Sequence, residues 1–222
     1  MIQKKILLFI SLTISVISVR AQGVSFSYLI PKNGYLSAPV SPFSLRGIGI
    51  GDNAGLETGF SLYNIPGLSM DNLPFDSDKP LTGPHFSVLV PAEVFFKIPL
   101  GDLKVKLSGG GFTWWNINSR INEGNMDRGF RKHYSYKIIN TDFSLDNKLG
   151  FGWLVGVDFE FPINRDVSIN FGGHYLDGGV KTGLNGSYVA LDQNDQIINE
   201  SINLPVAEIL LQGFELSIGV QF

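Results

Sequence analysis

The chain contains no cysteine and only three histidines among its 222 residues. The absence of cysteine excludes a disulfide scaffold, thiolate metal sites and lipid attachment through an N-terminal cysteine. His85, His133 and His174 are too scattered to show the close ligand spacing of a zinc site. The run Gly109–Gly111 lacks the Lys-Ser/Thr pair of a phosphate-binding loop. We therefore expect no metal and no cofactor.

After residue 21 the chain also lacks any apolar run of the roughly 20 residues that a membrane-spanning helix needs. The first 21 residues have an apolar segment from Ile6 to about Val19, preceded by two lysines and followed by Ala21. This pattern is typical of a secretory signal peptide, with cleavage expected between Ala21 and Gln22. An uncleaved N-terminal membrane helix is the alternative. We expect residues 22–222 to form one domain.

Positive charge is scarce once the leader is removed. Of the 17 basic residues, Lys4, Lys5 and Arg20 lie in the leader, which leaves 14 basic against 20 acidic residues. The resulting net charge near −6 argues against nucleic acid as a partner. Apolar residues nevertheless make up 44% of the chain. Such a composition fits either a soluble β protein with a large core or a β-barrel with its apolar face in lipid.

Residues 149–161 distinguish these two classes. Large apolar residues occupy every second position there: Leu149, Phe151, Trp153, Val155, Val157, Phe159 and Phe161. A period of two over 13 residues indicates a strand longer than the usual five or six of soluble proteins. It matches a tilted membrane strand of about 9–11 residues with some overhang. Pairing Phe161 with Val167 sorts apolar and polar side chains onto separate faces.

The same alternation predicts eight strands, near residues 23–30, 44–51, 56–65, 86–99, 102–116, 147–162, 166–178 and 208–222. The connections between them alternate strictly between short turns and long loops. Transmembrane barrels have an even strand number, short periplasmic turns and long outer loops, and a closed ring avoids unpaired edges in lipid. We therefore predict an all-β, closed, antiparallel up-and-down transmembrane barrel with both termini on the periplasmic side.

The last strand ends on an aromatic residue after a run of alternating apolar positions: Phe214, Leu216, Ile218, Val220 and Phe222. With the leader and the eight strands, this motif resembles the small eight-stranded outer-membrane barrels, similar to the transmembrane domain of outer-membrane protein A. The resemblance covers the whole processed chain. It implies a place in the outer membrane of a Gram-negative bacterium, contact with outer-membrane lipid and lipopolysaccharide, and recognition of the terminal strand by the outer-membrane assembly machinery.

Strand parity places eight charged residues inside the barrel: Glu57, Glu93, Lys97, Lys104, Lys106, Asp158, Glu160 and Glu215. An eight-stranded barrel is just wide enough for side chains to fill, and buried charges must pair. We expect a filled polar lumen closed by salt bridges, with a narrow ion path as the alternative. Lys97 is expected opposite Lys104, which is unfavourable unless a carboxylate such as Glu160 lies between them. His174 is expected opposite Leu154.

Aromatic and small residues give two further expectations. An interfacial girdle is expected from residues near the strand ends: Trp114, Trp115, Trp153, Tyr175 and Phe214. Gly109–Gly111 lies inside a predicted strand, where small residues would let side chains from other strands cross the lumen.

A lipid-modifying enzyme would need a serine within hydrogen-bond reach of a histidine. Ser87 near His85 and Ser135 near His133 permit such a pair, but no motif joins them.

The long loops are the expected binding surface. Residues 117–148 are mildly basic, and Tyr134, Tyr136 and Ile138 are expected to extend a strand beyond the bilayer. Such a loop suits anionic lipopolysaccharide or a protein partner, and a solvated strand extension is the alternative. Residues 183–206 contain no basic residue. We predict a non-enzymatic barrel acting in envelope integrity or in partner binding through these loops, with a small pore or a lipid-modifying enzyme as alternatives.

Overall fold

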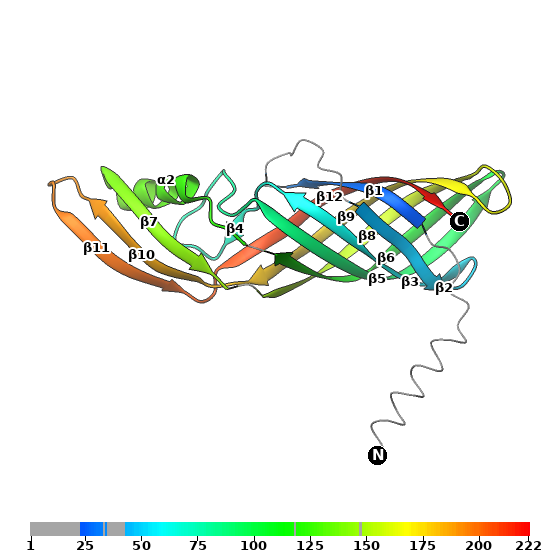
Figure 1. The fold of residues 1–222 in the computed structure, drawn as a ribbon, viewed down its shortest axis with the longest axis horizontal. Helices are drawn as coiled ribbons and strands as arrows, with labels where there is room; N and C mark the ends of the chain where they lie inside the picture. The colour runs from blue at the N-terminus through cyan, green and yellow to red at the C-terminus, as the bar shows by residue number, and fades with distance from the viewer. Residues whose placement is uncertain (1–22, 33, 35–42, 118, 147) are drawn as a thin grey trace, which may run out of the picture.

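The computed structural model describes residues 23–32, 34, 43–117, 119–146 and 148–222, so the predicted signal peptide and its Ala21–Gln22 cleavage site lie outside the described residues. Eight strands form a closed ring (Figure 1). In ring order they are β1 (Gly23–Pro31), β2 (Phe43–Ile50), β3 (Ala54–Ile65), β5 (His85–Leu100), β6 (Leu103–Ile117), β8 (Leu149–Pro162), β9 (Ser168–Lys181) and β12 (Glu208–Gln221). β12 pairs with β1, and every neighbouring pair is antiparallel. The predicted eight-stranded up-and-down barrel is confirmed.

The two ends of the ring differ in their connections. Short turns join β2 to β3, β5 to β6 and β8 to β9 at one end, which we call the turn end. Gly23 pairs with Gln221 there, so the first described strand begins where the last one finishes. The long connections that follow β3, β6 and β9 lie at the opposite end, which we call the loop end (Figure 1). The predicted alternation of short and long connections is therefore confirmed.

The β8–β9 hairpin is two residues away from the predicted register. Phe161 pairs with Ile169 instead of Val167. The turn is longer than expected because the N–H of Ile163 donates to the carbonyl of Val167 at 2.9 Å. A shift of two residues leaves each side chain on its predicted face. It does place His174 opposite Gly156 and not opposite Leu154.

The outer wall of the ring is apolar. Large exposed side chains cover it, and Phe151, at 64% exposure, is among the most exposed of them. The alternating residues of the terminal strand belong to this wall: Phe214, Leu216, Ile218 and Val220. The rings of Trp153, Tyr175 and Phe214 form a row across β8, β9 and β12, with centroids 5.7 and 5.2 Å apart. The predicted position of Trp114 in the girdle is wrong, because parity turns that side chain into the lumen and leaves Trp115 outside.

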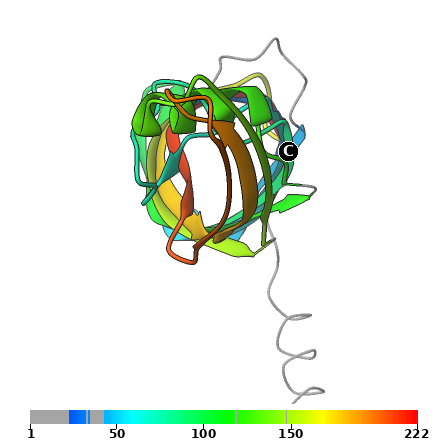
Figure 2. The same cartoon turned by 90° about the vertical axis from the view of Figure 1, so that its left-hand side faces the viewer.

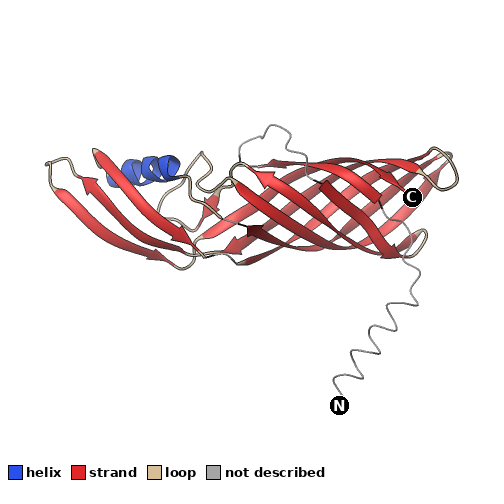
Figure 3. Cartoon of the chain, viewed as in Figure 1, coloured by secondary structure: helices blue, strands red, loops and turns tan. Residues whose placement is uncertain are grey.

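The long connections contain regular structure of their own. They form β4 (Met70–Asp71), α2 (Glu123–Tyr134), β7 (Ile138–Leu145), β10 (Leu184–Leu191) and β11 (Ile197–Leu204). The three-stranded sheet β11-β10-β7 and α2 project beyond the loop end (Figures 1 and 3). We call α2, this sheet and residues 66–84 the loop-end module. Within the described residues, no helix is long and apolar enough to cross a membrane.

The predicted strand extension through Tyr134 is wrong, because residues 123–134 form a helix. The side chain of Asn122 caps its first turn by accepting from the N–H of Asn125 at 3.2 Å. Met126 and Phe130, four residues apart, are buried against the sheet. Ser135 ends the helix in the left-handed conformation, with φ 58°. Only after this stop does β7 begin.

Candidate functional site

The barrel interior has two layers along its axis. Charged side chains occupy the half toward the turn end, and large apolar side chains occupy the half toward the loop end. The expectation of a polar lumen is therefore correct for one half only.

Arg46 on β2 lies at the centre of the charged layer. Its Nη2 lies 2.9 and 3.0 Å from the two carboxylate oxygens of Glu215, and its Nη1 lies 3.1 Å from Oε1 of Glu93. The hydroxyl of Ser108 donates to the second oxygen of Glu93 at 2.7 Å, and that of Tyr63 donates to Glu215. These bonds link five strands of the ring: β2, β3, β5, β6 and β12.

Arg46 is absent from the predicted set because β2 contains a β-bulge. Between Leu45 and Ile48, two residues of β2 face a single residue of β3, and Gly47 has φ 77°. A bulge exchanges the two faces of a strand beyond it. Alternation counted from Ile48 consequently points Arg46 outward, whereas its side chain is in the lumen.

A second group of ion pairs lies beside Arg46. The ammonium of Lys106 is 2.8 Å from Oε1 of Glu57 and 3.1 Å from Oδ2 of Asp158. Because each partner comes from a different strand, this triad joins β3, β6 and β8. Both carboxylates and the lysine have less than a tenth of their side-chain surface exposed. Charges buried this deeply are tolerated only when they are paired, as they are here.

Lys97 faces Lys106 across the β5–β6 hairpin, so the predicted pairing of Lys97 with Lys104 is wrong. The carboxylate of Glu160 lies 2.9 Å from the ammonium of Lys97 and pairs with that lysine. Lys104 lies near the turn and is exposed. The structure thus gathers seven of the eight predicted charges inside the lumen, while Lys104 is exposed at the turn-end mouth beside Glu160.

His174 lies between two carboxylates of the charged layer. Its Nε2 is 3.6 Å from Oδ2 of Asp158, and its Nδ1 is 3.8 Å from Oε1 of Glu215. The ring rests on Gly156, where a Cβ would stand only 2.0 Å from the imidazole. A cavity of about 40 Å³ lies beside His174 in this layer. It would hold no more than a few water molecules.

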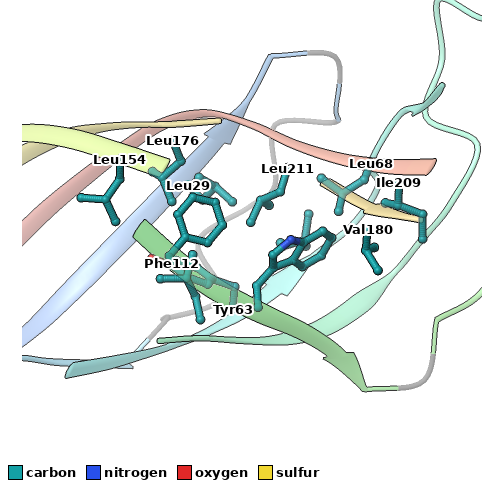
Figure 4. Packing of buried hydrophobic residues seen from close by; sticks show 12 residues of the cluster. Leu29, Tyr63, Leu68, Phe112, Leu154, Leu176, Val180, Ile209 and Leu211 are labelled. Carbon is teal, nitrogen blue, oxygen red and sulfur yellow. The ribbon is translucent and has the colours of Figure 1, made fainter. Parts of the chain in front are cut away.

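Twelve buried side chains fill the apolar layer (Figure 4): Leu29, Tyr63, Ile65, Leu68, Leu89, Phe112, Trp114, Leu154, Leu176, Val180, Ile209 and Leu211. The large rings fit because glycines stand opposite them. A Cβ on Gly150 would come 2.1 Å from the indole nitrogen of Trp114, and one on Gly152 would come 2.4 Å from Phe112. The crossing side chains were expected over Gly109–Gly111, but they lie over these glycines of β8.

The candidate serine–histidine pairs do not form. His85 is fully buried and its Nε2 lies 2.9 Å from Oγ1 of Thr82, while Ser87 donates to the amide oxygen of Asn116. In the ranges that the structure covers, no serine hydroxyl is hydrogen-bonded to a histidine. The same ranges hold no group of three or more His, Asp or Glu side chains placed to bind a metal ion.

The loop-end module has its own core around Phe130, which α2 presses against the sheet. The ring of Phe75 packs on Phe130 at 4.9 Å and passes over Gly129, where a Cβ would come within 2.2 Å of it. On the sheet side, the hydroxyl of Tyr188 donates to Glu200 at 2.7 Å. Burial of Tyr188, with the neighbouring hydroxyl of Tyr136 and the carboxylate of Glu200, raises the pKa of Tyr188.

Asp127 fastens α2 to β7. Its Oδ1 accepts hydrogen bonds from the backbone N–H of Thr141 at 2.9 Å and from the hydroxyl of Thr141 at 2.6 Å. Hydrogen bonds to a charged acceptor are stronger than neutral ones, so these two bonds hold the helix on the strand. The module is therefore an ordered extension of the barrel, and Figure 2, viewed from the loop end, shows it standing over the ring.

Comparisons with known proteins match the chain by shape only. No family model and no curated protein matches. The outer membrane protein OprG from Pseudomonas aeruginosa aligns over 90% of this chain and 92% of its own, with 11% identity and a TM-score of 0.49. The E. coli outer membrane protein W aligns over 91% and 97%, with 13% identity and a TM-score of 0.40. A major outer membrane protein from Thermus thermophilus aligns over 91% and 98%, with 14% identity and a TM-score of 0.43. The fold assignment rests on the hydrogen-bonded ring itself.

Proposed function

We propose that the protein is a non-enzymatic outer-membrane barrel whose sealed interior anchors an extracellular binding module. The observation that carries this proposal is the double closure of the lumen. The charged layer around Arg46 and the apolar layer around Trp114 lie one above the other, and each is filled by side chains from most of the ring. A solute would have to displace both layers to pass.

The wall of the barrel supports the location. Its exposed apolar residues would face hydrocarbon, and the turn end, where both termini of the ring lie, corresponds to the periplasmic side. The loop-end module then stands outside the cell. Lipid and lipopolysaccharide surround the wall, and the terminal strand ending at Phe222 is the element that the assembly machinery would bind.

The module supports a role in binding or in envelope integrity. It is ordered by a core of its own and by the bonds of Asp127, so it offers a fixed surface to a partner. Among the described residues, the side chains that fill the two layers of the lumen include none from α2 or from the sheet β11-β10-β7. The geometry therefore favours recognition at the loop end over transport through the ring.

Planar-bilayer recording tests this proposal. The purified full-length barrel is expected to produce no steady ohmic current, while a general porin reconstituted in the same lipid conducts. Slower migration on a detergent gel after boiling would verify that the sample was folded. A steady current that scales with the amount of inserted barrel would contradict the sealed lumen and favour a pore.

A further inference from the structure

The exposed face of α2 carries three cations without a counter-charge. Arg128, Arg131 and Lys132 are spaced i, i+3 and i+4, so they share one side of the helix. All three are exposed. In the part of the chain that is described, no carboxylate lies within 4.0 Å of any of them. Arg128 makes one long hydrogen bond, at 3.4 Å, to the amide oxygen of Asn125.

Two carboxylates in the loop-end module, those of Asp127 and Asp195, interact with other partners. Asp127 precedes Arg131 by four residues, a spacing at which the two would ordinarily pair on a helix. Instead its Oδ1 binds Thr141 on the buried side. Asp195, at the tip of the β10–β11 hairpin, pairs with Lys137 at 2.6 Å. The positive charge of the α2 face is thus left available to a ligand.

A rigid aromatic ring adjoins these cations. Tyr134 is 40% exposed and follows Arg131 by three residues. Its ring stacks on Phe130 at 6.0 Å and on Tyr136 at 5.5 Å, with 21° between the planes in each case. Because packing already fixes the ring, little conformational entropy is left to lose when a ligand binds. The surface combines fixed amphipathic area with exposed cations.

The position of α2 points to the occupant. The helix begins six residues after β6 ends at Ile117, and it lies beyond the loop end of the ring (Figure 1). Figure 2 shows α2 at the rim of the ring outline, with the sheet on its inner side. The face of α2 opposite Phe130, which packs on the sheet, is therefore turned away from the barrel axis and lies over the surface of the lipid around the ring. In the proposed location that surface is densely anionic.

We propose that Arg128, Arg131 and Lys132 bind the phosphate groups of the lipopolysaccharide that surrounds the barrel. Guanidinium groups bind phosphate oxygens in a bidentate manner, and an ammonium adds a point charge. This inference rests on the proposed outer-membrane location, and it names the ligand of the loop-end module. Binding there would tie each barrel to neighbouring lipopolysaccharide molecules.

Titration of the full-length barrel in nonionic detergent with purified lipopolysaccharide tests the proposal. The variant R131Q/K132Q removes one arginine and one lysine from the α2 face. The matched control K104Q/R165Q removes the same two residue types from the turn end, where both side chains are exposed. At low ionic strength the first variant is expected to raise the dissociation constant by about tenfold or more, and the control is expected to stay near wild type.

Chemically dephosphorylated lipopolysaccharide should bind the wild-type barrel as weakly as intact lipopolysaccharide binds R131Q/K132Q, and added salt should weaken wild-type binding. Equal binding by both variants, equal binding of the dephosphorylated material, or no binding to wild type would each overturn the proposal. Heat-modifiable migration shows separately that each variant is folded. The conductance measurement does not depend on this surface, so failure here would leave the sealed-lumen proposal standing.

Discussion

Arg46 on β2 and Glu215 on β12 are joined across the barrel interior by hydrogen bonds of 2.9 and 3.0 Å. The strand between them in the ring is β1, whose described residues pair with four residues of β2 and with nine of β12. Among the described residues, the side-chain bridge therefore spans the shortest backbone ladder of the ring. Its charge-assisted bonds add to the backbone hydrogen bonds that hold β2, β1 and β12 together.

Replacing Arg46 with methionine is expected to destabilise the barrel strongly. The change leaves the buried carboxylates of Glu93 and Glu215 without their cation, a loss that typically costs about 3–5 kcal/mol. Urea unfolding in detergent micelles, followed by tryptophan fluorescence, would measure it. Lys104→Met is the control, since that lysine is exposed, and Arg46→Met/Glu215→Gln should recover part of the loss. A midpoint for Arg46→Met equal to wild type would contradict the role of the bridge.

Gly150→Ala is expected to destabilise the apolar layer by about 1–3 kcal/mol through overpacking. A Cβ at this position would lie 2.1 Å from the indole nitrogen of Trp114, which has no room to retreat because it is fully buried. Gly111→Ala is the matched control on β6, because a Cβ there would have its nearest neighbour at 3.6 Å. Thermal unfolding should give a lower melting temperature for Gly150→Ala than for Gly111→Ala. Equal melting temperatures would contradict the close packing of Trp114 on Gly150.

The barrel could be predicted from the sequence because its signal is local and repeated. Every spanning strand must place apolar residues on one face, so alternation alone located all eight strands to within a few residues. The register error of two residues at Phe161 left every side chain of that hairpin on its predicted face of the sheet. Most of the lumen charges could therefore be predicted from the alternation of side chains along each strand. The β-bulge at Gly47 is the exception, since nothing in the alternation of β2 marks where the face changes.

The loop-end module could not be predicted in the same way. The alternation of Tyr134, Tyr136 and Ile138 favours a strand. Asn122 as a cap, and Met126 with Phe130 at helical spacing, favour the helix that forms. Phe75 packs over Gly129, which is 54 positions later in the chain. The spacing of neighbouring residues in the sequence cannot predict such a contact. The direction of the α2 cations depends on this packing, so it too required the structure.

Asp127→Ala is expected to loosen the loop-end module without unfolding the barrel. The substitution removes both hydrogen bonds to Thr141 that fasten α2 to β7, a loss of about 1–3 kcal/mol for bonds to a charged acceptor. Limited proteolysis should cut the variant faster between residues 119 and 146, while heat-modifiable migration stays normal. Glu123→Ala changes an exposed residue in the first turn of the same helix, and the protease should cut this variant at the wild-type rate. Cleavage of Asp127→Ala at that same rate would show that other contacts hold the helix.

Phe222→Ala is expected to lower the yield of assembled barrel in cells more than it lowers the stability of the barrel once folded. The side chain of Phe222 is 65% exposed and lies beyond the last residue of β12, so its removal takes little packing away from the ring. A residue that matters mainly for recognition should affect insertion and leave the urea midpoint of refolded protein nearly unchanged. Gln221→Ala is the neighbouring control. Comparison of the folded fraction in outer-membrane preparations with the midpoint of refolded protein would separate the two effects. If the folded fraction and the urea midpoint both fell together, or if neither fell, Phe222 would not be an assembly signal.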